Sequence, residues 1–274
     1  MKLATIRIHD NDHSSHTHAV RIEGDNAIVL DAADVGAVLA SPNPPTEMES
    51  MALGDCDFAP LVVRPDKIVC VGVNYLDHIA EMGRDRPTAP TYFAKYRSAL
   101  IGAHDDIVLP PPEVSTSIDW EAELAIVIGS PCRHASARQA MDAIAGFTVL
   151  NDVTARDYQR RTTQFLAGKT FEAMTPVGPI LVGADEVGDA SGLAIWTEVD
   201  GVRKQESNTA ELCFGAVDIV QDLSRVITLE PGDIIATGTP GGVGAARTPP
   251  QWLTAGSVVH CEIEGIGATH NRCR

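Results

Sequence analysis

The chain has 274 residues, and its 37 acidic and 21 basic side chains give a formal charge of −16 at pH 7. A surface that coats DNA or RNA needs clustered positive charge, so this balance argues against a nucleic-acid partner. With 44% hydrophobic and 21% charged residues, the composition is typical of a soluble globular protein. No apolar run approaches the ~20 residues of a membrane span, and no terminal segment has a targeting pattern, so we expect a cytoplasmic protein without a membrane partner.

The cysteines are scattered along the chain. None of the six forms a Cys-x-x-Cys pair or another spacing typical of a zinc site. We therefore expect buried free thiols.

Residues 1–64 are predicted to form a small β-rich domain. Short alternating stretches at 3–8, 18–22 and 27–30 are separated by Asp, Asn, Gly and Ser, which is typical of strands joined by turns. The proline-rich run SPNPPTE at 41–47 is incompatible with regular structure. A larger domain is expected over residues 65–274.

The larger domain is predicted to contain more strands than helices. Strands are expected at 67–75, 121–129 and 146–152, and later at ILVG, AIWTEVDG, DIIATG and SVVHCEIEG. Helices are expected at 136–146, with Ser136 as N-cap, and at 208–225, with Asn208 or Thr209 as N-cap. Without a regular alternation of strands and helices, we predict a mixed α+β fold, predominantly β. Its core should be a sandwich or barrel, not a doubly wound sheet.

Three carboxylates form the densest candidate site. Residues two apart in a strand share a face, so Glu121 and Glu123 lie roughly 6.6 Å apart at the backbone, close enough to hold one cation. Asp152 ends another apolar strand. Without Cys or His nearby, such a set suits Mg²⁺, Mn²⁺ or Ca²⁺. The alternative is that the two glutamates lie on a solvated face and Asp152 is a turn residue.

Two further segments carry candidate catalytic groups. His78 and Glu81 share a face if their segment is helical, and the imidazole can then orient a carboxylate that takes a proton from water. Lys169 can bind a carboxylate or stabilise an enolate. An exposed turn and a surface lysine are the alternatives. The loop TGTPGGVG at 237–244 lacks the pattern of a nucleotide site and is expected to direct backbone amides and the hydroxyls of Thr237 and Thr239 towards a small ligand.

Several motifs occur in an order that resembles the fumarylacetoacetate hydrolase family, over about residues 65–270. They are VGVNYLDHIAEMG, SALIGAHDDIVLP, IDWEAELAIVIG, NDVTARDYQ, GKTFEAMTPVGP, LEPGDIIATGTPGGVG and EIEGIG. The resemblance is to the branch of bacterial acylpyruvate hydrolases and 2-hydroxyhepta-2,4-diene-1,7-dioate isomerases. It implies a mixed β-sandwich roll with a small N-terminal lobe, a homodimer, and one bound Mg²⁺ or Mn²⁺.

The resemblance also implies roles for individual residues. The implied metal ligands are Glu121, Glu123 and Asp152, and the implied water-activating pair is His78 and Glu81. The implied contacts to the substrate and its developing charge are Arg156, Gln159, Lys169 and Thr239, the last of which meets the substrate carboxylate.

One departure from the family pattern lies at 95–98. Relatives have Lys-Pro-Pro-Ser or a similar run, whereas this chain has Lys95, Tyr96, Arg97 and Ser98. We hypothesise that Tyr96 or Arg97 reshapes the substrate pocket for a different distal group.

These features favour a metal-dependent hydrolase that cleaves a carbon–carbon bond. Its expected substrate is an acylpyruvate such as fumarylpyruvate or acetylpyruvate, which would yield pyruvate and a carboxylic acid in the catabolism of aromatic or related compounds. The alternative is an isomerase, decarboxylase or tautomerase of 2-oxo or 2-hydroxy-dienoic acids, including oxaloacetate, on the same metal site. The presence of both His78 and Glu81 favours hydrolysis. A protein with only a structural Ca²⁺ is a third hypothesis, but it would not need Lys169 or Arg156.

Four histidines cluster near the N-terminus, at His9, His13, His16 and His18. They could suggest a second metal site, but histidine-rich turns also bind metal adventitiously. We therefore expect these histidines to lie in a solvated turn between two strands.

Overall fold

The computed structural model describes residues 1–9 and 14–274. Its strands are β1 (Lys2–His9), β2 (Ser15–Glu23), β3 (Asn26–Leu30), β4 (Glu47–Ala52), β5 (Asp57–Phe58), β6 (Ile68–Gly72), β7 (Thr91–Ala94), β8 (Leu100–Ile101), β9 (Ile118–Asp119), β10 (Ala122–Ile128), β11 (Ile144–Asn151), β12 (Thr154–Ala155), β13 (Thr175–Gly183), β14 (Ala194–Val199), β15 (Val202–Asn208), β16 (Ile234–Ala236), β17 (Val258–Ile263) and β18 (Gly267–Arg272). Its α-helices are α1 (Val35–Ala40), α2 (Leu76–Glu81), α3 (Ala137–Ala143), α4 (Arg156–Gln159), α5 (Leu166–Lys169), α6 (Ala184–Val187) and α7 (Ala216–Val226). Short 3₁₀ helices are η1 (Leu53–Asp55), η2 (Arg97–Ala99), η3 (Thr209–Glu211) and η4 (Gly244–Ala246).

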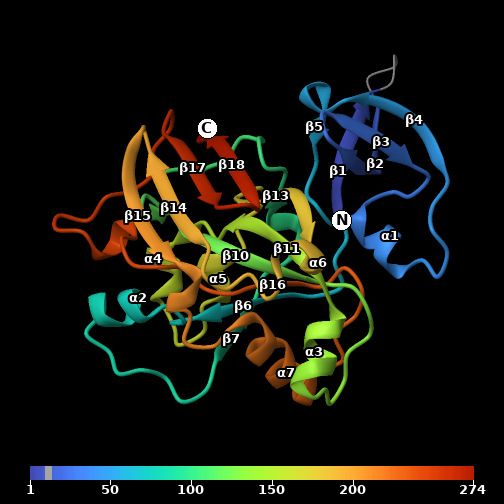
Figure 1. Cartoon of the computed structure of the whole chain (residues 1–274). Coiled ribbons are helices and arrows are strands. Elements are labelled where there is room, and N and C mark those ends of the chain that lie inside the picture. The colour runs from blue at the N-terminus through green and yellow to red at the C-terminus, as the bar shows by residue number, and fades with distance from the viewer. Residues whose placement is uncertain (10–13) are drawn as a thin grey trace.

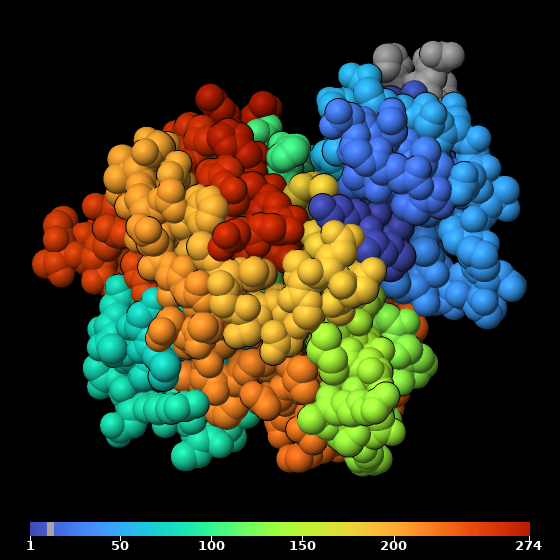
Figure 2. Space-filling model, viewed as in Figure 1, coloured from blue at the N-terminus to red at the C-terminus, as the bar shows by residue number. Residues whose placement is uncertain are grey.

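One long sheet runs through the molecule in the order β4-β3-β2-β1-β13-β11-β10-β16-β6-β7, with β5 and β8 added on β1 and β13. Strands β1 to β4 and helix α1 form a lobe beside the rest of the chain (Figure 1), and its residues gather on one side of the molecule in the space-filling view (Figure 2). Strand β1 also pairs with β13, with Leu3 opposite Leu181. These N-terminal strands therefore continue the main sheet. The domain boundary at residues 64 and 65 stays a prediction.

A second sheet, β15-β14-β17-β18, packs against β10, β11 and β13 of the long sheet. Every residue of β10 is buried, because both of its faces are covered. Leu124 and Ile126 belong to one hydrophobic cluster, and Ala125 and Val127 to another on the opposite face. The prediction of a mixed, mostly β fold is confirmed. In the described residues the sheets pack face to face and do not close into a barrel.

The helix predicted at 136–146 is confirmed as α3, and Ser136 is its N-cap. Its hydroxyl oxygen accepts from Gln139 N–H, and Ser136 N–H donates to the Gln139 side chain. The helix ends earlier than predicted, at Ala143, and Gly146 lies in β11. A glycine is required there because a Cβ at residue 146 would collide with the carbonyl oxygen of Val182 on the adjacent strand.

The predicted start of the helix at 208–225 is wrong, because α7 begins at Ala216. Asn208 instead caps the short helix η3. The buried side chain of Asn74 binds both the N–H and the C=O of Phe214, and its backbone carbonyl accepts from Cys213 N–H. These contacts hold residues 213 and 214 in a non-helical bend against Asn74, so the helix starts after them.

Among the described N-terminal residues, the histidines lie in strands and not in one turn. His9 ends β1 and pairs with Asp57 at 2.8 Å, and His16 and His18 lie in β2. His13 lies outside the described residues. The prediction of a solvated turn is therefore wrong for His9, His16 and His18.

All six cysteines are free thiols, as expected, and five of them are buried, whereas Cys56 is partly exposed. Within the described residues, no helix is both long and apolar enough to cross a membrane.

Candidate active site

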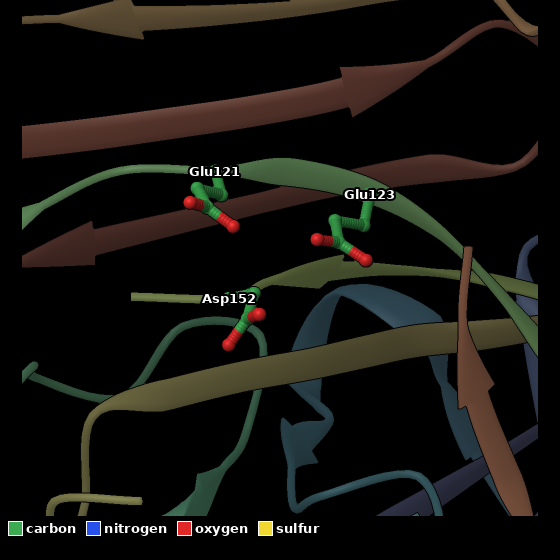
Figure 3. Close-up of side chains that lie close together, drawn as sticks. All are labelled: Glu121, Glu123 and Asp152. Atoms are coloured by element: carbon green, nitrogen blue, oxygen red, sulfur yellow. The ribbon is translucent and has the colours of Figure 1, made fainter. Parts of the chain in front are cut away.

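Antiparallel strands β10 and β11 bring the three predicted carboxylates together. Ala122 lies opposite Asn151, so Glu121 and Asp152 are neighbours across the pair, and Asp152 N–H donates to the Glu121 carbonyl at 2.9 Å. One carboxylate oxygen from each of Glu121, Glu123 and Asp152 lies within 4.8 Å of the others, and all three residues are buried. Figure 3 shows the three side chains grouped between these strands. The alternative of a solvated face is wrong.

Buried cations neutralise part of this cluster. Lys169 Nζ donates to Glu121 Oε2 at 2.6 Å and to Asp152 Oδ2 at 2.8 Å, and Lys95 Nζ donates to Asp152 Oδ1 at 2.5 Å. Burial lowers the pKa of Lys169, but the carboxylates of Asp152 and Glu121 outweigh it and raise this pKa above its ordinary value. Lys169 therefore stays protonated.

Glu123 is the least compensated of the three carboxylates. Its Oε2 accepts from Gly238 N–H at 2.8 Å, while burial and the nearby charges of Asp152 and Glu121 raise its pKa well above the ordinary range. Carboxylate oxygens keep free lone pairs beside such bonds. A divalent cation fits this set, because it would supply the missing positive charge through hard oxygen ligands.

Arg156 connects the cluster to a buried acid that sequence reasoning did not select. Its guanidinium lies 2.6 Å from Glu121 Oε1 and 2.7 Å from Asp119 Oδ2. Asp119 is fully buried and also accepts from the N–H groups of Gly244, at 2.6 Å, and Ala245, at 2.9 Å. Asp119 thus holds both Arg156 and the loop that follows β16.

His78 and Glu81 lie on helix α2, so the condition for their sharing a face is met. His78 Nδ1 is 3.0 Å from Glu81 Oε2, and Gly242 N–H donates to Glu81 Oε1 at 3.0 Å. Partial burial raises the pKa of Glu81, but the hydrogen bonds from His78 and Gly242 outweigh it and lower this pKa below its ordinary value. Glu81 is therefore ionised at neutral pH and can accept a proton.

The loop at 237–244 directs its amides to carboxylates of the site. Gly238 N–H donates to Glu123 and Gly242 N–H to Glu81. Thr239 lines the cavity, whereas the Thr237 hydroxyl donates to the Leu124 carbonyl at 2.9 Å. The hydroxyl of Thr239 accepts from Gln205 Nε2 at 2.8 Å. Thr237 is thus structural, and only Thr239 faces the ligand space.

A cavity of about 540 Å³ joins most of the predicted residues. Those on its wall are His78, Glu81, Glu121, Glu123, Arg156, Gln159, Lys169 and Thr239. Asp152 and Lys95 lie outside the wall, and Asp152 contacts it through Lys169. The cavity has the size and the few convergent polar groups of a small-molecule site.

The structure does not bring Tyr96 and Arg97 to this cavity. Both line a separate space of about 550 Å³, next to Arg64 and Asp66, and Tyr96 is 59% exposed. The side chain of Lys95 points inward to Asp152, and successive residues of extended chain point to opposite sides, so Tyr96 points outward.

Sequence reasoning missed three residues that organise the site: Lys95, Asp119 and Gln205. Asp119 precedes Glu121 by two residues, as Glu121 precedes Glu123. Residues two apart in extended chain share a face, so this spacing could have identified Asp119. The bonds of Lys95 to Asp152 and of Gln205 to Thr239 connect distant segments, and no local pattern marks them.

The sequence model described as "Fumarylacetoacetate (FAA) hydrolase C-terminal" matches residues 67–274. The Bos taurus protein named "Oxaloacetate tautomerase FAHD2B, mitochondrial" is 45% identical over 229 residues, which cover 83% of this chain and 72% of that protein.

Among solved structures, 2-hydroxyhepta-2,4-diene-1,7-dioate isomerase from Mycobacterium marinum has a TM-score of 0.79 at 33% identity and covers 100% of this chain and 98% of that one. A fumarylacetoacetate hydrolase from Exiguobacterium antarcticum has a TM-score of 0.85 at 29% identity, with 99% of each chain covered.

Proposed function

The chain belongs to the fumarylacetoacetate hydrolase family, and we propose that it is a divalent-metal enzyme that transfers a proton between the enol and keto forms of a 2-oxo acid such as oxaloacetate. The observation that carries this proposal is one cavity whose wall brings Glu121 and Glu123, two of the three buried carboxylates, together with Lys169 and the ionised Glu81. The likeness to a protein named oxaloacetate tautomerase, and to a dienoate isomerase, supports proton transfer over hydrolysis.

The proposed metal ligands are Glu121, Glu123 and Asp152, and the proposed metal is Mg²⁺ or Mn²⁺. When bound, the metal supplies a Lewis acid that polarises the 2-oxo group and lowers the energy of the enolate. The three carboxylates are pre-positioned for this role, because their oxygens already lie within 4.8 Å of one another.

The remaining side chains bind the acid and move its proton. The protonated ammonium of Lys169 faces the negative charge that develops on the substrate oxygen. Thr239 and Gln159 offer hydrogen bonds to the substrate carboxylate. Glu81, held by His78, takes the proton from one form and returns it in the other. These cationic and donor groups attract an anion to a protein of charge −16. Homodimer formation and a cytoplasmic location stay predictions.

Hydrolysis of an acylpyruvate is the second candidate. The hydrogen-bonded pair of His78 and Glu81 favours it, because the Glu81 side chain is 26% exposed and water can reach it. In that reaction, water activated by Glu81 adds to the distal carbonyl. The carbon–carbon bond then breaks, and pyruvate leaves as its enolate and takes up a proton.

Loss of enol ultraviolet absorbance separates the candidates. Chelator-stripped protein is mixed with oxaloacetate, acetylpyruvate or fumarylpyruvate, with and without Mg²⁺ or Mn²⁺, and pyruvate is quantified at the end. We expect enol oxaloacetate to decay in a metal-dependent way without an increase in the amount of pyruvate formed. This activity should be lost in Glu81→Gln. Metal-dependent release of pyruvate from an acylpyruvate, with no effect on oxaloacetate, would favour the hydrolase.

A further inference from the structure

Two positively charged side chains on the cavity wall have no assigned role. They are Arg84 and Arg160, both exposed at the mouth. The three inner cations, Lys95, Lys169 and Arg156, are all bound to buried carboxylates. In the part of the chain that the structure describes, neither Arg84 nor Arg160 has a side-chain hydrogen bond or an ion pair. Their guanidinium groups are thus free to bind an anion that enters the cavity.

Arg160 lies on the same helix face as Arg156 of the inner site. It follows helix α4 directly, keeps a helical backbone, and donates its N–H to the Arg156 carbonyl at 3.1 Å. Side chains four residues apart share a helix face, with roughly 5–6 Å between their Cβ atoms. Because Arg156 contacts the proposed metal ligand Glu121, Arg160 lies about one helical turn further out along the same wall.

Arg84 comes from a second segment of the wall. It lies just after helix α2, and its N–H donates to the Ile79 carbonyl at 3.1 Å, which ties it to the helix that carries His78 and Glu81. The Glu81 carboxylate is already engaged by His78 and by Gly242 N–H. Two arginines from separate segments thus face one ligand space with their charges uncompensated.

We propose that Arg160, assisted by Arg84, binds the substrate carboxylate that is remote from the metal, so that the enzyme selects 2-oxo dicarboxylates over 2-oxo monocarboxylates. This inference rests on the proposed function. In a four-carbon 2-oxo dicarboxylate, the two carboxylates are separated by two carbons, a span that one turn of helix can match. A guanidinium binds a carboxylate through two parallel N–H bonds, which gives orientation as well as charge.

The kinetic test compares oxaloacetate with its 4-methyl ester, which lacks the remote charge. We expect Arg160→Gln to raise KM for oxaloacetate about tenfold, with kcat changed less than about twofold and the ester unaffected. Arg84→Gln should give a smaller change of the same kind. The matched control is Arg161→Gln, because the Arg161 guanidinium stacks on the Tyr158 ring at 3.4 Å and is not on the cavity wall. Equal losses for both substrates, or no change in KM for oxaloacetate, would overturn the proposal.

A binding measurement separates this proposal from the proposed function. Calorimetry with the Mg²⁺-loaded protein compares malate with malate 4-methyl ester, two stable analogues that differ only in the remote carboxylate. Arg160→Gln should weaken malate about tenfold and leave the ester unchanged, whether or not the wild type turns over oxaloacetate. If the wild type binds both analogues equally, the remote subsite is refuted. If it discriminates between them but shows no tautomerase activity, only the proposed function fails.

Discussion

Replacing Asp119 with asparagine should destabilise the protein strongly although the change is isosteric. The carboxylate is fully buried and accepts from Arg156, Gly244 N–H, Ala245 N–H and its neighbour Trp120 N–H. An asparagine keeps one acceptor oxygen, and its NH₂ group then faces donors. Breaking one side of a buried ion pair costs about 3–5 kcal/mol. We expect the free energy of unfolding to fall by that amount, and the midpoint of thermal unfolding by roughly 10 °C.

Thermal unfolding followed by circular dichroism, on chelator-stripped protein, measures this change without any contribution from bound metal. The control is Asp66→Asn, whose carboxylate is 77% exposed and, among the residues that the structure describes, binds only Lys67, at 2.6 Å. Water screens such an exposed pair, so the control should unfold within about 2 °C of the wild type. If Asp119→Asn is as stable as the control, the buried Asp119 network does not support the site as described here.

Three further changes test other parts of the site. Mg²⁺ at 100 times its Kd should stabilise the wild type by about 2.7 kcal/mol in thermal unfolding but not Glu123→Gln, and equal stabilisation of both would exclude Glu123 as a ligand. Because the pKa of Glu81 is lowered, its ionised form contributes above the ordinary pKa of 4.5 and is lost as pH falls below it. The acid limb of kcat/KM, which reports groups of the free enzyme, should therefore lie below pH 4.5 and move upward in His78→Ala; an unmoved limb would contradict the pairing. Gln205→Leu should raise KM several-fold in steady-state assays by releasing Thr239, and an unchanged KM would show that Thr239 needs no anchor.

The parts of the fold that follow a local pattern could be predicted from the sequence. The strand that carries Glu123 is marked by its apolar run, and the spacing of Glu121 and Glu123 places both on one face. The i, i+3 spacing of His78 and Glu81 gives their contact once the segment is helical. Asp152 joins them because it ends the neighbouring strand.

The rest depends on contacts between distant segments. The start of α7 is set by Asn74, about 140 residues earlier, which overrides the helical pattern of residues 208–215. The Lys95 side chain points inward, so Tyr96 lies outside the cavity. No local signal in the sequence shows which of these two side chains points inward. Gln205 lies in one sheet, and Thr239 follows a strand of the other. The hydrogen bond between them therefore forms only when the two sheets pack together.

Deuterium incorporation at C3 of a 2-oxo acid reports metal-dependent proton transfer by the enzyme. Enol oxaloacetate is converted in D₂O by chelator-stripped protein with added Mg²⁺, trapped at once by reduction to malate, and examined by proton NMR. We predict one deuterium at C3 in a single configuration, which is absent without metal and in Glu81→Gln. Deuterium divided equally between both configurations, at the rate seen without protein, would show that the enzyme does not transfer this proton.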